Sequence, residues 1–117
     1  MKETPFKEKV EKWLASNDFW FIKYWAGSKF TKEGIPDILA CIDGTFYGIE
    51  LKGTGGTPSV LQLKKLADIR EAGGIGVLLY PEDFDYFTAY VLGTEIGDHW
   101  YRENKRKQKE LFEKLNS

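Results

Sequence analysis

The chain has 117 residues, of which 42% are hydrophobic, 15% aromatic and 30% charged. This length and composition predict one folded domain over residues 1–117 and exclude a disordered segment. The formal net charge of -1 argues weakly against nucleic-acid binding, and the single Cys41 and single His99 exclude a disulfide framework and a His/Cys zinc cluster.

The N-terminal residues predict a helix. Thr4 and Pro5 fit an N-cap and a first helical position. Apolar residues then recur at helical spacing up to about residue 17: Phe6, Val10, Trp13 and Leu14. The same stretch has no apolar run typical of a signal peptide, and no segment approaches the ~18 apolar residues needed to span a bilayer. We therefore expect a soluble cytoplasmic protein without a membrane partner.

Three strand-like segments follow. The aromatic and β-branched run Phe19–Trp25 predicts a strand covered on both faces, and residues 26–34 read as a polar loop. Two further runs, Asp37–Ile42 and Thr45–Lys52, are joined by Asp43-Gly44, a strong signal for a two-residue hairpin turn.

The second half of the chain alternates helix and strand. A helix is expected from Pro58 to about Ala72, ended by a Gly-Gly pair, and a buried strand over Ile75–Tyr80. Residues 81–97 fit either a short helix or an edge strand, and a terminal helix should begin near Asp98. The order of these elements predicts an α/β fold with a mixed sheet flanked by helices and an extra C-terminal helix.

A two-residue turn at Asp43-Gly44 also fixes which residues face each other. Asp37 would then stand opposite Glu50, with their Cβ atoms ~4.5–5.5 Å apart. Because side chains alternate along a strand, Lys52 shares the face of Glu50, and Gly48 should leave that face open. The opposite face reads as a core face: Ile38, Ala40, Tyr47, Ile49 and Leu51.

Two facing carboxylates repel each other and need a cation. Lys52 supplies one positive charge, and Mg²⁺ or Mn²⁺, which prefer oxygen ligands, would supply more. Such an ion lowers the pKa of a bound water and polarises a phosphoryl oxygen. Lys52 would orient the attacking water or stabilise developing charge; its acidic neighbours should keep it protonated, so we do not assign it as the proton acceptor. The alternative is a surface ion network of Asp37, Glu50 and Lys52 on an edge hairpin.

Pro36-Asp37 followed by Glu50-Leu51-Lys52 resembles the motif of the PD-(D/E)XK nuclease superfamily. More narrowly, residues 34–74 resemble the VRR-NUC family of small phage and bacterial nucleases, and the similarity extends from about Thr4 to Pro81. The resemblance implies a restriction-endonuclease-like αβββαβ core over about residues 4–81 and a C-terminal extension over about 82–117. It also implies metal-dependent hydrolysis of DNA phosphodiester bonds and allows a phage or prophage origin.

Carried over by position, the resemblance assigns a catalytic site. Asp37 and Glu50 would be metal ligands, with the backbone carbonyl of Leu51 as a third, and Lys52 would be the catalytic lysine. Gln62 would lie beside the active site on the following helix. Its alternative role is helix capping, since Ser59-x-x-Gln62 fits a capping box.

The first helix departs from the family pattern. Relatives usually carry a glutamate where this chain has Lys7. If this helix still donates a carboxylate to the metal, Glu11 is the better candidate and Glu8 the second, because Glu11 lies one turn below Lys7 on nearly the same side. The alternative is that both are solvated helix charges.

Partners follow from the same reasoning. We expect Ser28, Lys29 and Lys32, in the loop before Asp37, and Lys23 in the preceding strand, to contact DNA phosphates. The alternative for the loop lysines is a solubilising role. The resemblance further implies a structure-specific endonuclease for branched DNA of the Holliday-junction type, acting as a homodimer. Residues 84–90 and the C-terminal helix are candidates for the interface, and the alternative is that they pack in the core of the domain. A catalytically degenerate module that binds DNA or protein is the alternative function.

Overall fold

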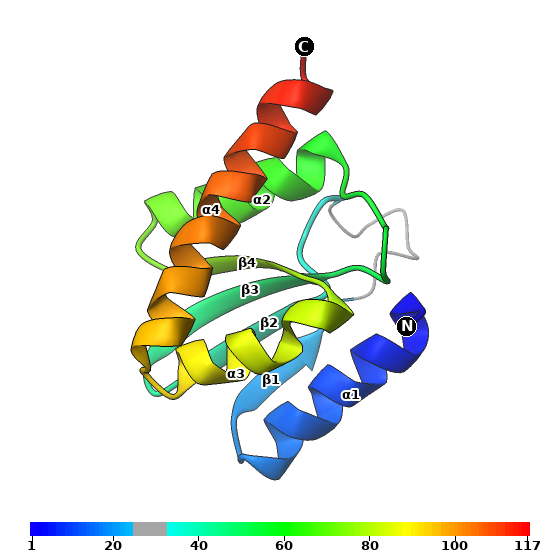
Figure 1. Ribbon diagram of the computed structural model, residues 1–117. Coiled ribbons are helices and arrows are strands. Elements are labelled where there is room, and N and C mark those ends of the chain that lie inside the picture. Colours follow the sequence, from blue (N-terminus) through cyan, green and yellow to red (C-terminus); the bar gives the residue numbers. More distant parts are fainter. Residues whose placement is uncertain (25–32) are drawn as a thin grey trace.

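The computed structural model describes residues 1–24 and 33–117, and these residues form a four-stranded mixed sheet with helices on both faces (Figure 1). The strands lie across the sheet in chain order, with β1, β2 and β3 antiparallel and β4 parallel to β3. The elements are α1 (Glu3–Ser16), β1 (Trp20–Lys23), β2 (Ile38–Ile42), β3 (Thr45–Leu51), α2 (Val60–Glu71), β4 (Ile75–Leu79), a 3₁₀ turn (Pro81–Asp83), α3 (Phe84–Val91) and α4 (Glu95–Leu115). The α/β fold, the mixed sheet and the terminal helix are as predicted.

The hairpin and its register are confirmed. Asp43 and Gly44 have φ angles of 50° and 79°, the left-handed pair that a type I′ turn requires. Ile42 pairs with Thr45 and the ladder continues to Ile38 opposite Ile49. The next position along this ladder holds Asp37 and Glu50.

One face of the sheet packs on the main core, as the alternation of side chains predicts. Residues of β2 and β3 on this face are buried against α1, α3 and the beginning of α4. The buried cluster includes Ile38, Ala40, Tyr47, Ile49 and Leu51 from the sheet and Phe6, Val10, Leu14, Phe84, Phe87 and Trp100 from the helices. Residues 81–97, for which two structures were open, therefore form a 3₁₀ turn, helix α3 and the first turn of α4, and Phe84 and Phe87 of α3 lie in the core.

Helix α2 covers part of the opposite face, and this corrects the expectation for Gly48. A Cβ atom at Gly48 would lie 2.4 Å from Cδ1 of Ile69. Gly48 is buried because its missing side chain lets α2 approach the sheet, so it does not leave the face open. Leu63 and Leu66 of α2 pack there against Leu78.

The expectation that the first strand is covered on both faces is wrong. β1 is an edge strand, and Trp20 and Ile22 are 62% and 45% exposed. Aromatic and β-branched residues are typical of strands, but which elements cover a strand is decided by the rest of the chain. The start of the first helix also differs: its N-cap is Lys2, without a side-chain capping bond, so Pro5 lies inside the first turn, where its missing N–H has no cost.

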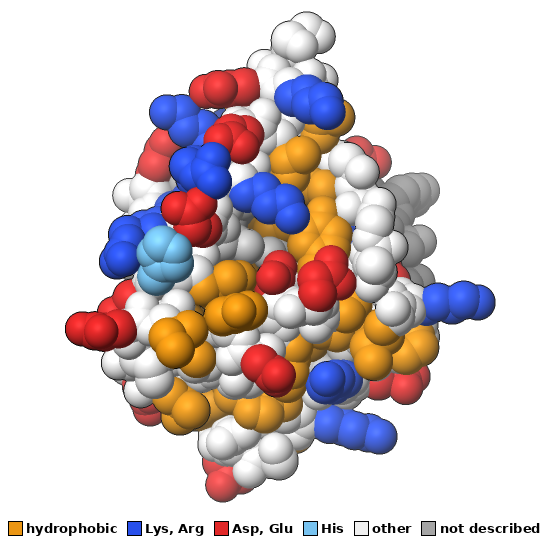
Figure 2. All heavy atoms as spheres, in the orientation of Figure 1, with side chains coloured by type: hydrophobic (Ala, Val, Ile, Leu, Met, Phe, Trp, Pro, Cys, Tyr) orange, Lys and Arg blue, Asp and Glu red, His pale blue; other side chains and the backbone are white. Residues whose placement is uncertain are grey.

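Helix α4 begins at Glu95, earlier than predicted, and runs along the free edge of β4. The Thr94 side chain caps it by accepting a hydrogen bond from the N–H of Gly97. Acidic and basic side chains are mixed along its outer surface (Figure 2). None of the helices in the described ranges is both long and apolar enough to cross a membrane.

Candidate functional site

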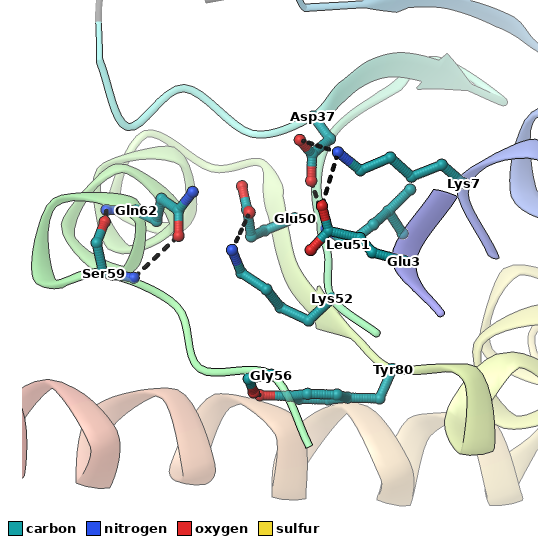
Figure 3. A network of polar contacts seen from close by, with 10 residues as sticks. All are labelled: Glu3, Lys7, Asp37, Glu50, Leu51, Lys52, Gly56, Ser59, Gln62 and Tyr80. Atoms are coloured by element: carbon teal, nitrogen blue, oxygen red, sulfur yellow. Dashed lines mark hydrogen bonds and ion pairs between the residues drawn. The ribbon is translucent and has the colours of Figure 1, made fainter. Parts of the chain in front are cut away.

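Asp37 and Glu50 converge at one end of the β2–β3 pair. Asp37 stands immediately before β2, where its Oδ2 accepts a hydrogen bond of 2.8 Å from the N–H of Leu51 and its carbonyl oxygen accepts one of 2.8 Å from the N–H of Tyr24. Glu50 lies in β3, and both carboxylates point into the same space (Figure 3). The hairpin register therefore brings the two acids together as the sequence predicted.

Glu50 is a buried acid with one unsatisfied oxygen. The residue is 1% exposed, and its Oε2 lies 3.3 Å from Nζ of Lys52. Its Oε1 is buried and has no hydrogen-bond partner among the described residues. Burial and the negative charge of Asp37 raise the pKa of Glu50 to about 8, against the opposing effect of Lys52. A buried carboxylate oxygen without a partner is costly, so a proton or a cation bound at this position would stabilise it.

The donor set fits a hard divalent cation. The described residues contain no group of three or more His, Cys, Asp or Glu side chains placed to hold a metal. Mg²⁺, however, is commonly bound through one or two carboxylates, with water and substrate phosphate completing its shell. Asp37 and the orphaned Oε1 of Glu50 supply such a pair.

Lys52 is held rigidly beside this pair. Its side chain is mostly buried, and its N–H donates a hydrogen bond of 3.1 Å to the carbonyl oxygen of Leu79, which extends the β3–β4 ladder by one residue. The ammonium group therefore lies next to Glu50 in a mostly buried position. Glu50 and Lys52 are thus not the exposed surface network that was the alternative.

Lys7 enters the site from α1, which the sequence did not predict. Its Nζ lies 3.2 Å from Oδ1 of Asp37 and 3.1 Å from Oε2 of Glu3, one helical turn earlier (Figure 3). Burial alone would lower the pKa of Lys7, but the charges of Asp37 and Glu3 outweigh this effect and raise it. The i,i+4 spacing of Glu3 and Lys7 was the available signal for this pair.

The N-terminus is fixed against the chain that follows Lys52. The N–H of Thr54 donates to the carbonyl oxygen of Met1 at 3.0 Å, and the terminal ammonium donates to Oγ1 of Thr54 at 3.1 Å. A Cβ atom at Gly53 would lie 2.8 Å from the backbone nitrogen of Glu3. Gly53 therefore permits the close approach that places Glu3 and Lys7 beside Asp37.

The two other acids considered on α1 have different surroundings. Glu11 lines a pocket of about 400 Å³ together with Lys7, Lys23 and Asp37, but its carboxylate is paired with Nζ of Lys23 at 3.1 Å. Glu8 is exposed. The structure thus brings Glu11 and Lys23 to the side of Asp37 and leaves Glu8 in solvent. Larger grooves lie along α4, away from the paired carboxylates, and have no comparable orphaned group.

Gln62 caps α2, as its alternative role predicted. Its N–H donates to Oγ of Ser59 at 3.1 Å, and its Oε1 accepts from the N–H of Ser59 at 2.9 Å. The amide nitrogen is left on the side of Glu50 (Figure 3). The capping contact therefore fixes the side chain without using its second polar atom.

The remaining candidates of the sequence, Ser28, Lys29 and Lys32, lie outside the described residues. No protein-family model matches the chain, and comparisons with curated proteins and with solved structures give no match. The functional conclusion therefore depends on the geometry of the site and on the motif.

Proposed function

We propose that this chain is a Mg²⁺- or Mn²⁺-dependent DNA endonuclease of the VRR-NUC type, acting in the cytoplasm on branched DNA such as a Holliday junction. The observation that carries the proposal is the buried, unpartnered Oε1 of Glu50 next to the carboxylate of Asp37. A bound divalent cation would satisfy this oxygen and offset the repulsion between the two acids.

The topology supports a restriction-endonuclease-like core. The order α1, β1, β2, β3, α2, β4 agrees with the αβββαβ order that the family resemblance implies for about residues 4–81. The 3₁₀ turn, α3 and α4 then make up the C-terminal extension over about 82–117. The two acids and Lys52 lie at the ends of β2 and β3, where that core would place them.

The residues have distinct roles in this proposal. Asp37, Glu50 and the carbonyl of Leu51 would hold the cation, which would lower the pKa of a bound water and polarise a phosphoryl oxygen. Lys52, whose Nζ lies 3.3 Å from Glu50, would stabilise the charge that develops on the phosphate as one P–O bond forms and another breaks. The N–H of Leu51 fixes the orientation of Asp37.

Other side chains serve the substrate. Gln62 presents its amide nitrogen to the site, and Lys23, Ser28, Lys29 and Lys32 are assigned to the DNA backbone, as basic and hydroxyl side chains commonly are. A homodimer would present two such sites to two strands of a junction.

A cleavage assay tests the proposal. Labelled four-way, flap and linear DNA are incubated with the protein in Mg²⁺ or in EDTA. We expect cuts only with metal, and a loss of rate of at least about 100-fold in Asp37→Asn and in Lys52→Gln. Lys64→Gln is the matched control, because Nζ of Lys64 is also 3.2 Å from a carboxylate, that of Asp68, but on the surface. Metal-dependent cuts that persist at full rate in both site variants would refute the assignment.

The ion pair between Lys7 and Asp37 favours an alternative function for the chain. In this alternative, the chain is a degenerate module that binds DNA or a protein partner without cutting. An ammonium group in contact with a metal ligand reduces the attraction of that ligand for a divalent ion. Calorimetric titration with Mn²⁺ separates the two functions. DNA binding without any Mn²⁺ binding, either alone or with DNA, would favour the module.

A further inference from the structure

The two carboxylates of the site each have their own lysine. Asp37 contacts Lys7 at 3.2 Å, and Glu50 contacts Lys52 at 3.3 Å. Once Glu50 has lost its proton, the carboxylates of Glu3, Asp37 and Glu50 carry three negative charges against the two ammonium groups. A divalent cation that enters this cluster turns its net charge from −1 to +1, which is unfavourable in a partly buried place unless an anion follows.

The oxygens of Asp37 are both engaged. Oδ2 accepts the N–H of Leu51, and Oδ1 contacts the ammonium of Lys7. A cation that binds at Oδ1 must therefore displace Lys7 or share the oxygen with it. Glu3 offers Lys7 a second anionic partner at 3.1 Å, and a third of the Lys7 side chain is exposed, so the ammonium can leave Asp37 without becoming buried and unpaired.

The released ammonium remains next to the site. Lys7 and Lys23 both line the pocket beside Asp37, at the end of the sheet where the acids meet. Glu11 also lines this pocket and is paired with Lys23 at 3.1 Å, but the Lys23 side chain is 70% exposed and can turn to another anion. A phosphodiester group that approaches the pocket would therefore meet the ammonium groups of Lys7 and Lys23, whose positive charge complements its own negative charge.

We propose that Lys7 is a resident counter-ion that competes with the divalent cation for Asp37 and turns to the DNA phosphate when the cation binds. This inference rests on the proposed endonuclease function. It makes the binding of metal and of DNA cooperative: each ligand binds weakly alone and more tightly in the presence of the other, by the same factor in both directions. Lys7 therefore sets the metal affinity of the site, although it is not itself a ligand of the cation.

The test measures the affinity for Mn²⁺ by isothermal titration calorimetry in two conditions. One is without DNA, and the other is with a four-way junction built with phosphorothioate linkages. Without DNA, Lys7→Gln should bind Mn²⁺ about tenfold more tightly than the unmodified protein, because the competing charge is gone. With the junction, the affinity of the unmodified protein for Mn²⁺ should rise, and that of Lys7→Gln should rise much less. Lys64→Gln should match the unmodified protein in both conditions, and Lys7→Met provides a second neutral variant should Lys7→Gln fold poorly.

The outcomes separate the inference from the function on which it rests. Equal Mn²⁺ affinity of the unmodified protein and both Lys7 variants would overturn the role of Lys7 and leave the endonuclease proposal standing. If the junction does not change the Mn²⁺ affinity of the unmodified protein, the role of Lys7 is likewise overturned and the endonuclease proposal still stands. If no protein binds Mn²⁺ in either condition, the metal-dependent function fails as well.

Discussion

Glu50 carries a carboxyl group in surroundings that favour its neutral form. Burial and the charge of Asp37 raise its pKa to about 8, and the ammonium of Lys52 offsets only part of this effect. The sheet imposes this position, because Glu50 lies near the end of β3, opposite Leu78 of β4 and one position beyond the last residue pair of the β2–β3 ladder. A cation bound between the two carboxylates would therefore stabilise the folded protein, in addition to the role proposed for it in cleavage.

The raised pKa predicts how stability depends on pH in the metal-free protein. The folded state keeps a proton on Glu50 up to about pH 8, whereas the unfolded chain releases it near 4.5. Between these values the folded state binds more protons, so the free energy of unfolding should fall as pH rises from about 5 to about 8. Since one pKa unit corresponds to about 1.4 kcal/mol, the loss should reach a few kcal/mol. Urea unfolding in EDTA across this range measures it.

The variant Glu50→Gln is the control for this prediction. Its side chain has similar volume and no proton to lose, so its stability should change much less over the same range. Mn²⁺ added at pH 8 should restore stability to the unmodified protein and not to Glu50→Gln. Parallel pH profiles of the two proteins would contradict the assignment of the effect to Glu50.

At the scale of elements, α4 completes the hydrogen bonding of a sheet edge. Gly76 and Leu78 of β4 turn their backbone groups away from β3, and one stripe of α4 side chains meets them. Asn104 accepts from the N–H of Leu78 at 3.1 Å and donates to its carbonyl oxygen at 2.7 Å. The Tyr101 hydroxyl accepts from the N–H of Gly76 and donates to its carbonyl oxygen, which also accepts from Nε2 of Gln108. The helix takes the place of a further strand and blocks pairing with another chain.

This arrangement predicts that Asn104 contributes more to the free energy of unfolding than a polar helix residue usually does. Asn104→Ala leaves two buried backbone groups of Leu78 unpaired and should reduce the free energy of unfolding by about 2–4 kcal/mol. Glu113→Ala, an exposed substitution on the same helix, should change it by less than about 0.5 kcal/mol. Denaturant unfolding at constant pH measures both. A loss below about 1 kcal/mol in Asn104→Ala would mean that water replaces the side chain at this edge.

The elements show which parts of the fold are predictable from sequence. The turn at Asp43-Gly44 and the register it sets are local, because two residues with positive φ determine which residues face each other. The core face of β2 and β3 follows from alternation alone. The exposure of Trp20 cannot be predicted in this way, because it depends on how far α2 extends over the sheet. The position of α2 is set by contacts between residues far apart in the chain.

The same distinction holds for the candidate site. Asp37 and Glu50 were predictable together because one hairpin holds both. The contact of Lys7 with Asp37 was not, because it depends on the approach of the first turn of α1 to Gly53, a contact between segments some fifty residues apart. Asn104 also escaped prediction, since nothing in a polar helix residue indicates that it will face a sheet edge.

At the scale of the whole molecule, the two edges of the sheet differ in whether a helix covers them. The β4 edge is covered by α4, whereas β1 lies at the other edge. The N–H of Tyr24 donates to the carbonyl oxygen of Asp37, so the backbone N–H and C=O groups of the even-numbered β1 residues are directed at β2. Those of Phe21 and Lys23 point outward, away from the sheet. The exposed apolar side chains of Trp20 and Ile22 lie at this edge, on the same face as the exposed Phe46 of β3.

This asymmetry changes where we expect the proposed homodimer to form. Phe84 and Phe87, in the segment assigned to the interface from sequence, are buried in the core and are unavailable to a partner. Two β1 strands paired antiparallel about a two-fold axis at Phe21 would join their outward backbone groups and set Trp20 of one copy beside Ile22 of the other.

Sedimentation measurements over a range of protein concentrations test this interface. Trp20→Glu should raise the dimer dissociation constant at least about tenfold, because it places a charge in a contact that buries apolar surface. Tyr86→Glu, an equally drastic change at an exposed aromatic residue of α3, should leave the constant unchanged. Dissociation by Tyr86→Glu and not by Trp20→Glu would place the interface on α3 instead. A protein that is monomeric at all concentrations would show that the exposed strand edge is tolerated in the single chain, as the short length of β1 and the charge of Lys23 at its end would then explain.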